Sequence, residues 1–190
     1  MNAPPVTLAL LAINIAVFLL DMAGGSRLLT PFALWPIGEG FDLWQLVTYG
    51  FIHAGIGHIA FNMIGVYMFG GELERLWGSN RYLVYYLVCV IAAAIAQVVF
   101  SMMTGSRSPT VGASGGVFGL LLAFAMMFPH RKMMLIFLPV PIPAWLFVTL
   151  YGLLELYMGV TGTQAGVAHF AHLGGMVGGF LMMRAGRRRR

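Results

Sequence analysis

Residues 111–119 read Val-Gly-Ala-Ser-Gly-Gly-Val-Phe-Gly, and they open an apolar run that continues to Phe128. Ser114 therefore stands at the mouth of what the pattern predicts to be a membrane helix. In lipid, a serine hydroxyl usually bonds to a carbonyl one turn earlier or to a neighbouring helix, and glycines usually form packing faces. A catalytic role for Ser114 requires a base, an oxyanion hole and water, so the rest of the chain must supply them.

The composition is that of a membrane protein. Of the 190 residues, 59% are hydrophobic and 9% are charged, whereas soluble domains are about 25% charged. The length allows about six helices of roughly 20 residues, and we expect a single domain over residues 1–190. The net charge of +5 comes from basic residues that flank apolar segments. Membrane topology explains these residues better than nucleic-acid binding does.

Six apolar segments predict an all-α membrane protein, a bundle of six transmembrane helices. The expected bounds are about 5–21, 57–77, 81–103, 114–128, 143–159 and 167–183. The connection at residues 22–47 is too apolar for an ordinary loop and holds Trp35 and Trp44. Because tryptophan favours the membrane interface, we expect this loop to lie in the outer headgroup layer. Residues 133–138 precede alternating prolines, which predicts an extended or interfacial segment.

The basic residues predict the orientation of the chain. With both termini in the cytoplasm, only Arg27 and Arg107 of the eleven Lys and Arg residues lie outside. The other nine lie inside, namely Arg75, Arg81, Arg131, Lys132, Arg184 and residues 187–190. This excess follows the positive-inside rule and places Ser114 at the outer end of its helix. We expect a compact multi-pass protein of a bacterial inner (plasma) membrane.

Polar residues on three of the predicted helices share one depth in the membrane. His58 and Asn62 are four residues apart, so they lie on one face of the second helix. His169 and His172 lie in the outer third of the sixth. At 1.5 Å per residue, these side chains and Ser114 should lie within roughly 10 Å of the outer surface. Because scattered structural polar residues would not agree in depth, this set is a candidate functional site.

Small residues allow two of these helices to approach closely. His172, Gly175 and Gly179 lie on one face of the sixth helix, and the two glycines carry no side chain to hold another helix away. The fourth helix has a complementary small face beside Ser114, formed by Gly112, Gly115 and Gly119. Proton transfer between a serine and a histidine needs about 2.6–3.2 Å between heavy atoms. Glycine faces permit that approach.

Together these motifs resemble the rhomboid family of intramembrane serine proteases, in its compact six-helix bacterial type. The segments that carry the resemblance are GASG at 112–115, HIAFN at 58–62, AHLGG at 171–175 followed by Gly179, WQLVTYGFIH at 44–53, and FGGELE at 69–74 before Gly78. The resemblance covers about residues 5–185. Each motif is short, so the specificity comes from their order, spacing and depth.

The resemblance implies a role for each site residue. Ser114 would be the nucleophile and His172 the base, with His58, Asn62 and backbone N–H groups near Ser114 forming the oxyanion hole. Phe118 stands where the family often has an aromatic residue stacked on the base.

The family's His-xx-Gly-xxx-Gly pattern fits His172, Gly175 and Gly179. It does not fit His169, which we expect to line a water-filled entrance. The family usually has an arginine where this chain has Gln45.

Because no acidic residue is expected near His172, the sequence predicts a Ser–His dyad that opens to the outer face. The partners expected are transmembrane protein substrates and the lipid bilayer. We expect no cofactor, metal or nucleic acid. The sequence does not define the oligomeric state. Glu155 could face the interior, lie at the outer interface or be protonated. The alternatives are a proteolytically inactive rhomboid-like protein that binds membrane clients, a small transporter, and a metal site of His58, His169 and His172, which lacks a nearby carboxylate or cysteine.

Overall fold

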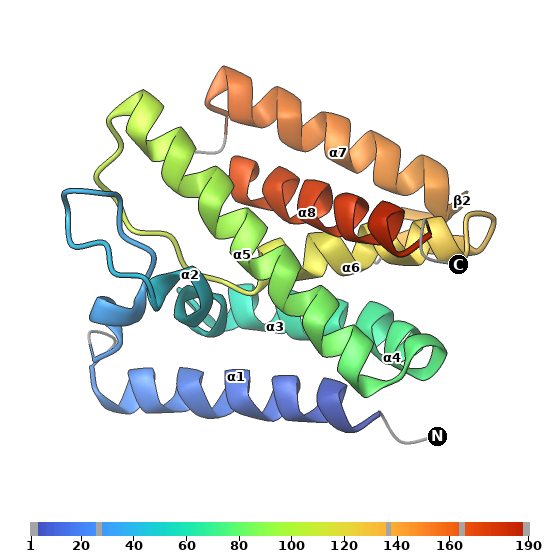
Figure 1. The fold of residues 1–190 in the computed structure, drawn as a ribbon, viewed down its shortest axis with the longest axis horizontal. Helices are drawn as coiled ribbons and strands as arrows, with labels where there is room; N and C mark the ends of the chain where they lie inside the picture. The colour runs from blue at the N-terminus through green and yellow to red at the C-terminus, as the bar shows by residue number, and fades with distance from the viewer. Residues whose placement is uncertain (1–3, 26–27, 136–137, 164–165, 188–190) are drawn as a thin grey trace.

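The computed structural model describes residues 4–25, 28–135, 138–163 and 166–187. The chain forms a bundle of helices with a small hairpin at one end (Figure 1). The longer helices are α1 (Pro5–Ala23), α3 (Ile56–Gly65), α4 (Gly71–Trp77), α5 (Ser79–Thr104), α6 (Ser114–Met127), α7 (Ala144–Thr161) and α8 (His169–Arg187). The shorter elements are η1 (Thr30–Phe32), α2 (Gln45–Thr48), η2 (Tyr49–Phe51), η3 (Val66–Gly70), β1 (Lys132–Leu135) and β2 (Leu138–Pro143).

Three helices among the described residues are long and apolar enough to cross a membrane: α1, α5 and α7. A fourth span arises if the bent pair Gln45–Phe51 and Ile56–Trp77 counts as one, with a bend of 102° between its parts. The helix expected over 57–77 runs from Ile56 to Trp77 and contains a π-helical turn, η3, between α3 and α4. The chain is therefore a mostly helical membrane protein, and the count of six spans stays a prediction.

The expectation of an all-α fold is wrong for one segment. β1 and β2 form an antiparallel hairpin in which Lys132 pairs with Pro143 and Met133 with Ile142. Alternating prolines exclude a helix here. They allow a strand in a two-stranded hairpin, because only every second residue must donate a hydrogen bond to its neighbour. The last proline, Pro143, then caps the start of α7.

Helix α5 lies at the centre of the bundle. Of the residues in its most apolar window, 44% are buried, against 17% for α1 and 17% for α7. Helix α8 packs directly on α5 at Gly174 and Gly178, where a Cβ atom would overlap Ala96 and Ala92. Helix α6 lies against the same helix, because the Tyr85 hydroxyl donates to the Gly119 carbonyl at 2.8 Å. The site residues on α6 and α8 are therefore carried by helices that pack directly on the most buried of the three apolar spans.

Glu74 ties the first helix to this centre. Its buried carboxylate accepts hydrogen bonds from the Val6 and Thr7 N–H groups at 2.9 and 2.7 Å, and from the Ser79 hydroxyl at 2.7 Å. The first amides of a helix have no partner within it, so a carboxylate placed there stabilises them. The start of α1 is thus fixed to the turn between α4 and α5.

The connection between α1 and α3 supports the segment that leads to Ser114. Leu34 and Thr110 exchange two backbone hydrogen bonds of 2.9 Å. Gln45 is buried and holds the connection together. It accepts from the Trp35 N–H and donates to two carbonyls, those of Pro31 and Gly40. The chain's glutamine therefore anchors this loop where the family usually has an arginine.

Candidate active site

Ser114 is the first residue of α6, and the preceding backbone is fixed. The Gly112 N–H donates to the Tyr49 carbonyl at 3.0 Å, and Gly112 itself has φ +125°. Within the helix, the first amide bonded four residues back is that of Val117, which donates to Ala113. The amides of residues 114–116 precede this ladder, so they form a set of N–H donors around the serine. Such donors suit a developing oxyanion.

The Ser114 hydroxyl contacts an imidazole of α8. Its Oγ lies 2.8 Å from Nε2 of His172, a side chain that is 8% exposed. The His172 ring stacks on Phe118 with 4.2 Å between centroids and an interplanar angle of 6°. Tyr151 of α7 packs on the Phe118 ring, with 4.9 Å between the two ring centroids. The imidazole is thus held in one plane with one nitrogen facing the serine.

Glycines set the spacing between the two helices, although not all as expected. A Cβ on Gly175 would overlap the Gly115 carbonyl, so α6 and α8 touch through backbone at this point. Gly119 permits two contacts, because a Cβ there would overlap Cys89 of α5 and would lie 3.1 Å from the Gly175 carbonyl oxygen of α8. The atoms nearest the Gly179 Cβ position belong to Tyr85 and Cys89 of α5, so this glycine allows α8 to approach α5.

His58 lies on the other side of the serine. Its Nδ1 accepts a hydrogen bond from the Ala54 N–H at 3.4 Å, so the proton of the neutral ring is on Nε2. A Cβ on Gly112 would stand 2.6 Å from that Nε2 and 3.7 Å from Ser114 Oγ. Because Gly112 has no side chain, a gap remains between Ser114 Oγ and His58 Nε2. The Nε2–H group of His58 is a hydrogen-bond donor across this gap from the serine.

Asn62 is buried one turn further along α3. Its Nδ2 donates to the His58 carbonyl at 2.9 Å within the same helix. An amide nitrogen carries two N–H donors, so one remains for an oxyanion. The structure thus brings Ser114, His172 and His58 around one space, and Asn62 follows His58 by one turn of the same helix.

The expectation that no acidic residue lies near His172 is wrong. Oε2 of Glu155, on α7, lies 2.9 Å from Nδ1 of His172 and 2.7 Å from Nδ1 of His169. The expected water-lined position of His169 is also not observed. Its side chain is buried, and its Nε2 faces the Thr163 carbonyl at 3.2 Å. Sequence reasoning named Glu155 but could not orient it, because the facing direction depends on how α7 docks on α8.

Three of these residues could also hold a metal ion. One ligand atom each from Glu155, His169 and His172 lies within 4.8 Å of the others, and His58 is not a member of this group. Around a tetrahedral zinc at about 2.0–2.1 Å, ligand atoms lie about 3.4 Å apart. The two nitrogen–oxygen distances are 2.7 and 2.9 Å. They match hydrogen bonds that share a carboxylate oxygen.

His53 lies behind the serine loop, between η2 and α3. It is 3% exposed, its Nε2 accepts from the Ala113 N–H at 3.5 Å, and its ring meets the His58 ring edge-on at 5.1 Å. Burial of the ring, together with the neighbouring His58, lowers the pKa of His53 to about 4. This histidine therefore stays neutral at pH 7 and supports the backbone that precedes Ser114.

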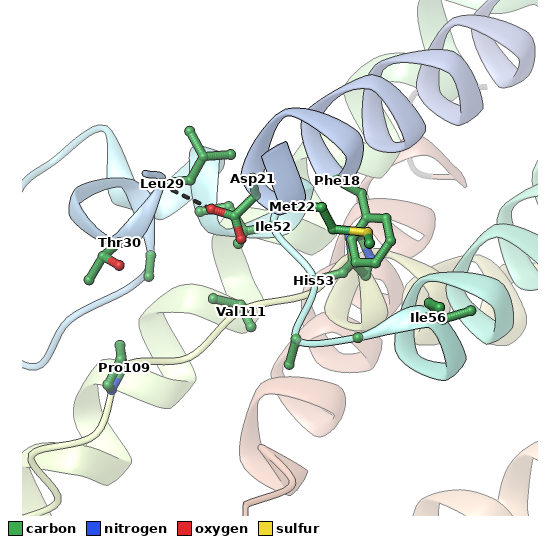
Figure 2. A pocket seen from close by; sticks show the side chains of 13 residues that line it. Phe18, Asp21, Met22, Leu29, Thr30, Ile52, His53, Ile56, Pro109 and Val111 are labelled. Carbon is green, nitrogen blue, oxygen red and sulfur yellow. Dashed lines mark hydrogen bonds between the residues drawn. The ribbon is translucent and has the colours of Figure 1, made fainter. Parts of the chain in front are cut away.

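A pocket of about 500 Å³ lies on the α1 side of His53 (Figure 2). Figure 2 shows Phe18 and Met22 of α1 beside the histidine, and the Asp21 carboxylate, which accepts from the Leu29 N–H at 3.2 Å. Neither Ser114 nor His172 lines this space. The pocket is therefore separate from the gap around the serine.

The comparisons with known proteins agree with the geometry. Residues 40–189 match the family model described as the Rhomboid domain. The chain is 33% identical over 185 residues to rhomboid protease GluP of Bacillus subtilis. The matched region covers 93% of this chain and 34% of GluP. It is 30% identical to the mitochondrial Rhomboid protein 1 of Saccharomyces cerevisiae, over 91% of this chain and 51% of that protein.

A third relative is rhomboid protease GlpG of Serratia proteamaculans, 32% identical over 95% of this chain and 62% of GlpG. The chain thus spans between about a third and about two thirds of the length of these relatives.

Proposed function

The chain belongs to the rhomboid family, and we propose that it is an intramembrane serine endopeptidase. Its reaction is the hydrolysis of peptide bonds in or near transmembrane segments of membrane proteins. The observation that carries the proposal is the 2.8 Å contact between Ser114 Oγ and His172 Nε2 at the mouth of an apolar helix. The relatives named as proteases, GluP and GlpG, support the same reaction.

The proposed chemistry follows from the positions of the hydrogen-bonding groups. Nε2 of His172 accepts the proton of Ser114 as Oγ attacks the substrate carbonyl carbon, and it returns that proton to the leaving amine. The carbonyl oxygen becomes an oxyanion in the gap beside Gly112, where the first amides of α6 and the His58 N–H point. Asn62 supplies a further donor. Each such donor is worth about 10²–10³ in rate in soluble enzymes.

Water then hydrolyses the acyl-enzyme from the outer face. Ser114 and His58 are only partly buried, which supports access by water. A substrate helix must unwind to expose its scissile bond, so we propose substrates with small or helix-weakening residues near the outer end of a transmembrane segment. The bilayer setting we propose is six spans in a bacterial plasma membrane, with both termini cytoplasmic.

We propose that substrates reach the site beside α7. Only 17% of the apolar window of this helix is buried in the bundle, so most of its surface faces the bilayer from which a substrate would come. A disulfide crosslink between α3 and α7 should slow cleavage of a membrane substrate and leave a soluble probe of Ser114 unaffected. Unchanged cleavage of the membrane substrate would contradict this route.

The proposed activity is tested with a fluorophosphonate probe on the purified, folded protein. Wild type should label and should cleave a transmembrane substrate in proteoliposomes, whereas Ser114→Ala should do neither. Folded wild type that fails to label would instead favour an inactive rhomboid-like protein that binds membrane clients.

The base is identified by comparing His172→Ala with His169→Ala. Because only His172 contacts the serine, His172→Ala should abolish labelling and His169→Ala should leave a measurable rate. Equal losses from the two substitutions would undermine the assignment of His172.

A further inference from the structure

We propose that Glu155 is a positioning residue for His172, which makes the site a Glu–His–Ser triad rather than a dyad. This inference rests on the proposed protease function. The chain of contacts is short and continuous. Glu155 Oε2 lies 2.9 Å from His172 Nδ1, and His172 Nε2 lies 2.8 Å from Ser114 Oγ. Three helices contribute one residue each: α7, α8 and α6.

The carboxylate selects the tautomer that the reaction requires. A neutral imidazole carries one proton, and the nitrogen without it is the acceptor. Because Glu155 accepts at Nδ1, the proton of His172 lies there, and Nε2 presents its lone pair to the Ser114 hydroxyl. The opposite tautomer would donate to the serine oxygen and could not remove its proton.

Burial strengthens this effect. Glu155 is 3% exposed and His172 is 8% exposed, so water screens their interaction weakly. When His172 takes the serine proton, an imidazolium forms directly beside the carboxylate. A hydrogen-bonded ion pair in such surroundings stabilises the charge that develops in the transition state.

His169 holds the carboxylate in place. Its Nδ1 lies 2.7 Å from Glu155 Oε2 and its Nε2 lies 3.2 Å from the Thr163 carbonyl. With Glu155 ionised, the ring nitrogen of His169 that faces Oε2 donates to it. This second donor satisfies the carboxylate, which would otherwise be costly to bury. His169 therefore helps to position His172 by holding Glu155 in place.

The test compares Glu155→Gln with wild type in the full chain, reconstituted in proteoliposomes with a transmembrane substrate. Glutamine keeps the size, but its N–H₂ group can donate to Nδ1 and favour the wrong tautomer of His172. We expect kcat to fall by about 10²–10⁴, as when the acid of a soluble triad is replaced by its amide, with KM within about twofold of wild type. Fluorophosphonate labelling should slow in parallel.

Thr149→Val is the matched control on the same helix. Thr149 is exposed, and its hydroxyl bonds only to the Trp145 carbonyl of its own helix among the contacts described. This substitution should leave kcat and KM unchanged. It separates an effect of the carboxylate from a general disturbance of α7.

A second variant distinguishes loss of the carboxylate from misfolding of the protein. Glu155→Ala leaves a space that formate can fill, so formate should raise its kcat by at least about tenfold, saturably, with no effect on Ser114→Ala. A Glu155→Gln enzyme with wild-type kcat would overturn the proposal. So would losses that formate does not rescue and that accompany a lowered melting temperature, because those indicate a structural role.

The two proposals fail in different ways. If wild type neither labels nor cleaves, the protease function fails. If wild type and Glu155→Gln cleave equally well while Ser114→Ala is inactive, the protease function stands and only the role of Glu155 fails.

Discussion

Gly112 is the residue on which the geometry of the proposed oxyanion hole depends. A Cβ there would stand 2.6 Å from His58 Nε2 and 2.7 Å from its Cε1, and the φ of +125° already disfavours any other residue. We expect Gly112→Ala to displace the His58 ring and lower kcat/KM by about 10²-fold or more, the value of a lost oxyanion donor. Cleavage of a transmembrane substrate in proteoliposomes measures the effect.

Gly105→Ala is the control for backbone strain alone. Gly105 has φ +68° and no atom within 4 Å of its Cβ position, so the substitution should cost about 1–2 kcal/mol of stability and leave kcat/KM intact. Equal activity of the two variants would show that the space beside His58 is not needed.

His53 makes stability depend on pH in a defined direction. Its pKa falls from 6.5 to about 4 on folding, so the folded state favours the neutral ring. The resulting contribution is fully present above pH 6.5 and is lost as the pH falls towards 4, with a total of up to about 3 kcal/mol. Glutamine at this position does not titrate and can still accept from the Ala113 N–H.

The melting temperature of wild type and His53→Gln in detergent, measured between pH 7.5 and 4.5, tests this expectation. Wild type should lose more stability across this interval than the variant does. The same pH dependence in both proteins would rule out a contribution from His53.

Short spacing decides the geometry at some single residues. His58 and Asn62 share a helical face because they are four residues apart, and the His-xx-Gly-xxx-Gly pattern implied by the resemblance selected His172, the histidine that contacts Ser114. The same reasoning failed for Glu155. Its contact with His172 joins two helices whose relative rotation no local pattern records, so only the packed structure reveals it.

At the scale of elements, the contact between α6 and α8 sets the distance from nucleophile to base. A Cβ on Gly175 would overlap the Gly115 carbonyl. This carbonyl belongs to the backbone, so it cannot rotate away as a side chain could. We expect Gly175→Ala to push the helices apart, lengthen the Ser114–His172 contact and lower kcat by about 10²-fold. The rate of fluorophosphonate labelling reports the loss without involving substrate access.

Gly152→Ala provides the comparison at the other interface of α8. A Cβ on Gly152 would lie 3.5 Å from Cε of Met176, an ordinary contact with a flexible side chain. Labelling by this variant should match wild type. If Gly175→Ala also labels at the wild-type rate, the glycine contact does not control the catalytic distance.

The elements that sequence patterns did not predict have identifiable causes. The π-helical turn at Val66–Gly70 keeps the apolar character of its surroundings, so hydropathy predicts the continuous helix but not the π-helical turn within it. The turn follows Gly65, whose Cβ position lies 2.5 Å from Val117 of α6. Close contact with α6 thus accompanies the π-helical turn. The hairpin before α7 was predicted only as an extended segment, since its pairing joins residues on both sides of a turn.

For the whole molecule, the loops that lead to the site and the two termini lie at opposite ends of the bundle. In Figure 1 the marks N and C lie at the end that carries the hairpin, whereas the connection after α1 and the loop after α5 lie at the other end. The salt bridge between Arg107 and Glu39, 2.8 Å long, joins these two loops. One end therefore carries both termini, and the other carries the loops that lead to Ser114.

This separation agrees with the orientation that the sequence predicts, in which nine of the eleven Lys and Arg residues flank helix ends on the side of the two termini. Ser108 and His130 are exposed residues in loops that the proposed orientation places outside and inside, respectively, and Cys89 is fully buried. In intact cells a membrane-impermeant maleimide should label Ser108→Cys. It should label His130→Cys only after the membrane is permeabilised. Wild type, with Cys89 alone, should stay unlabelled. The reverse pattern would place Ser114 at the cytoplasmic face and would contradict a site that opens outward.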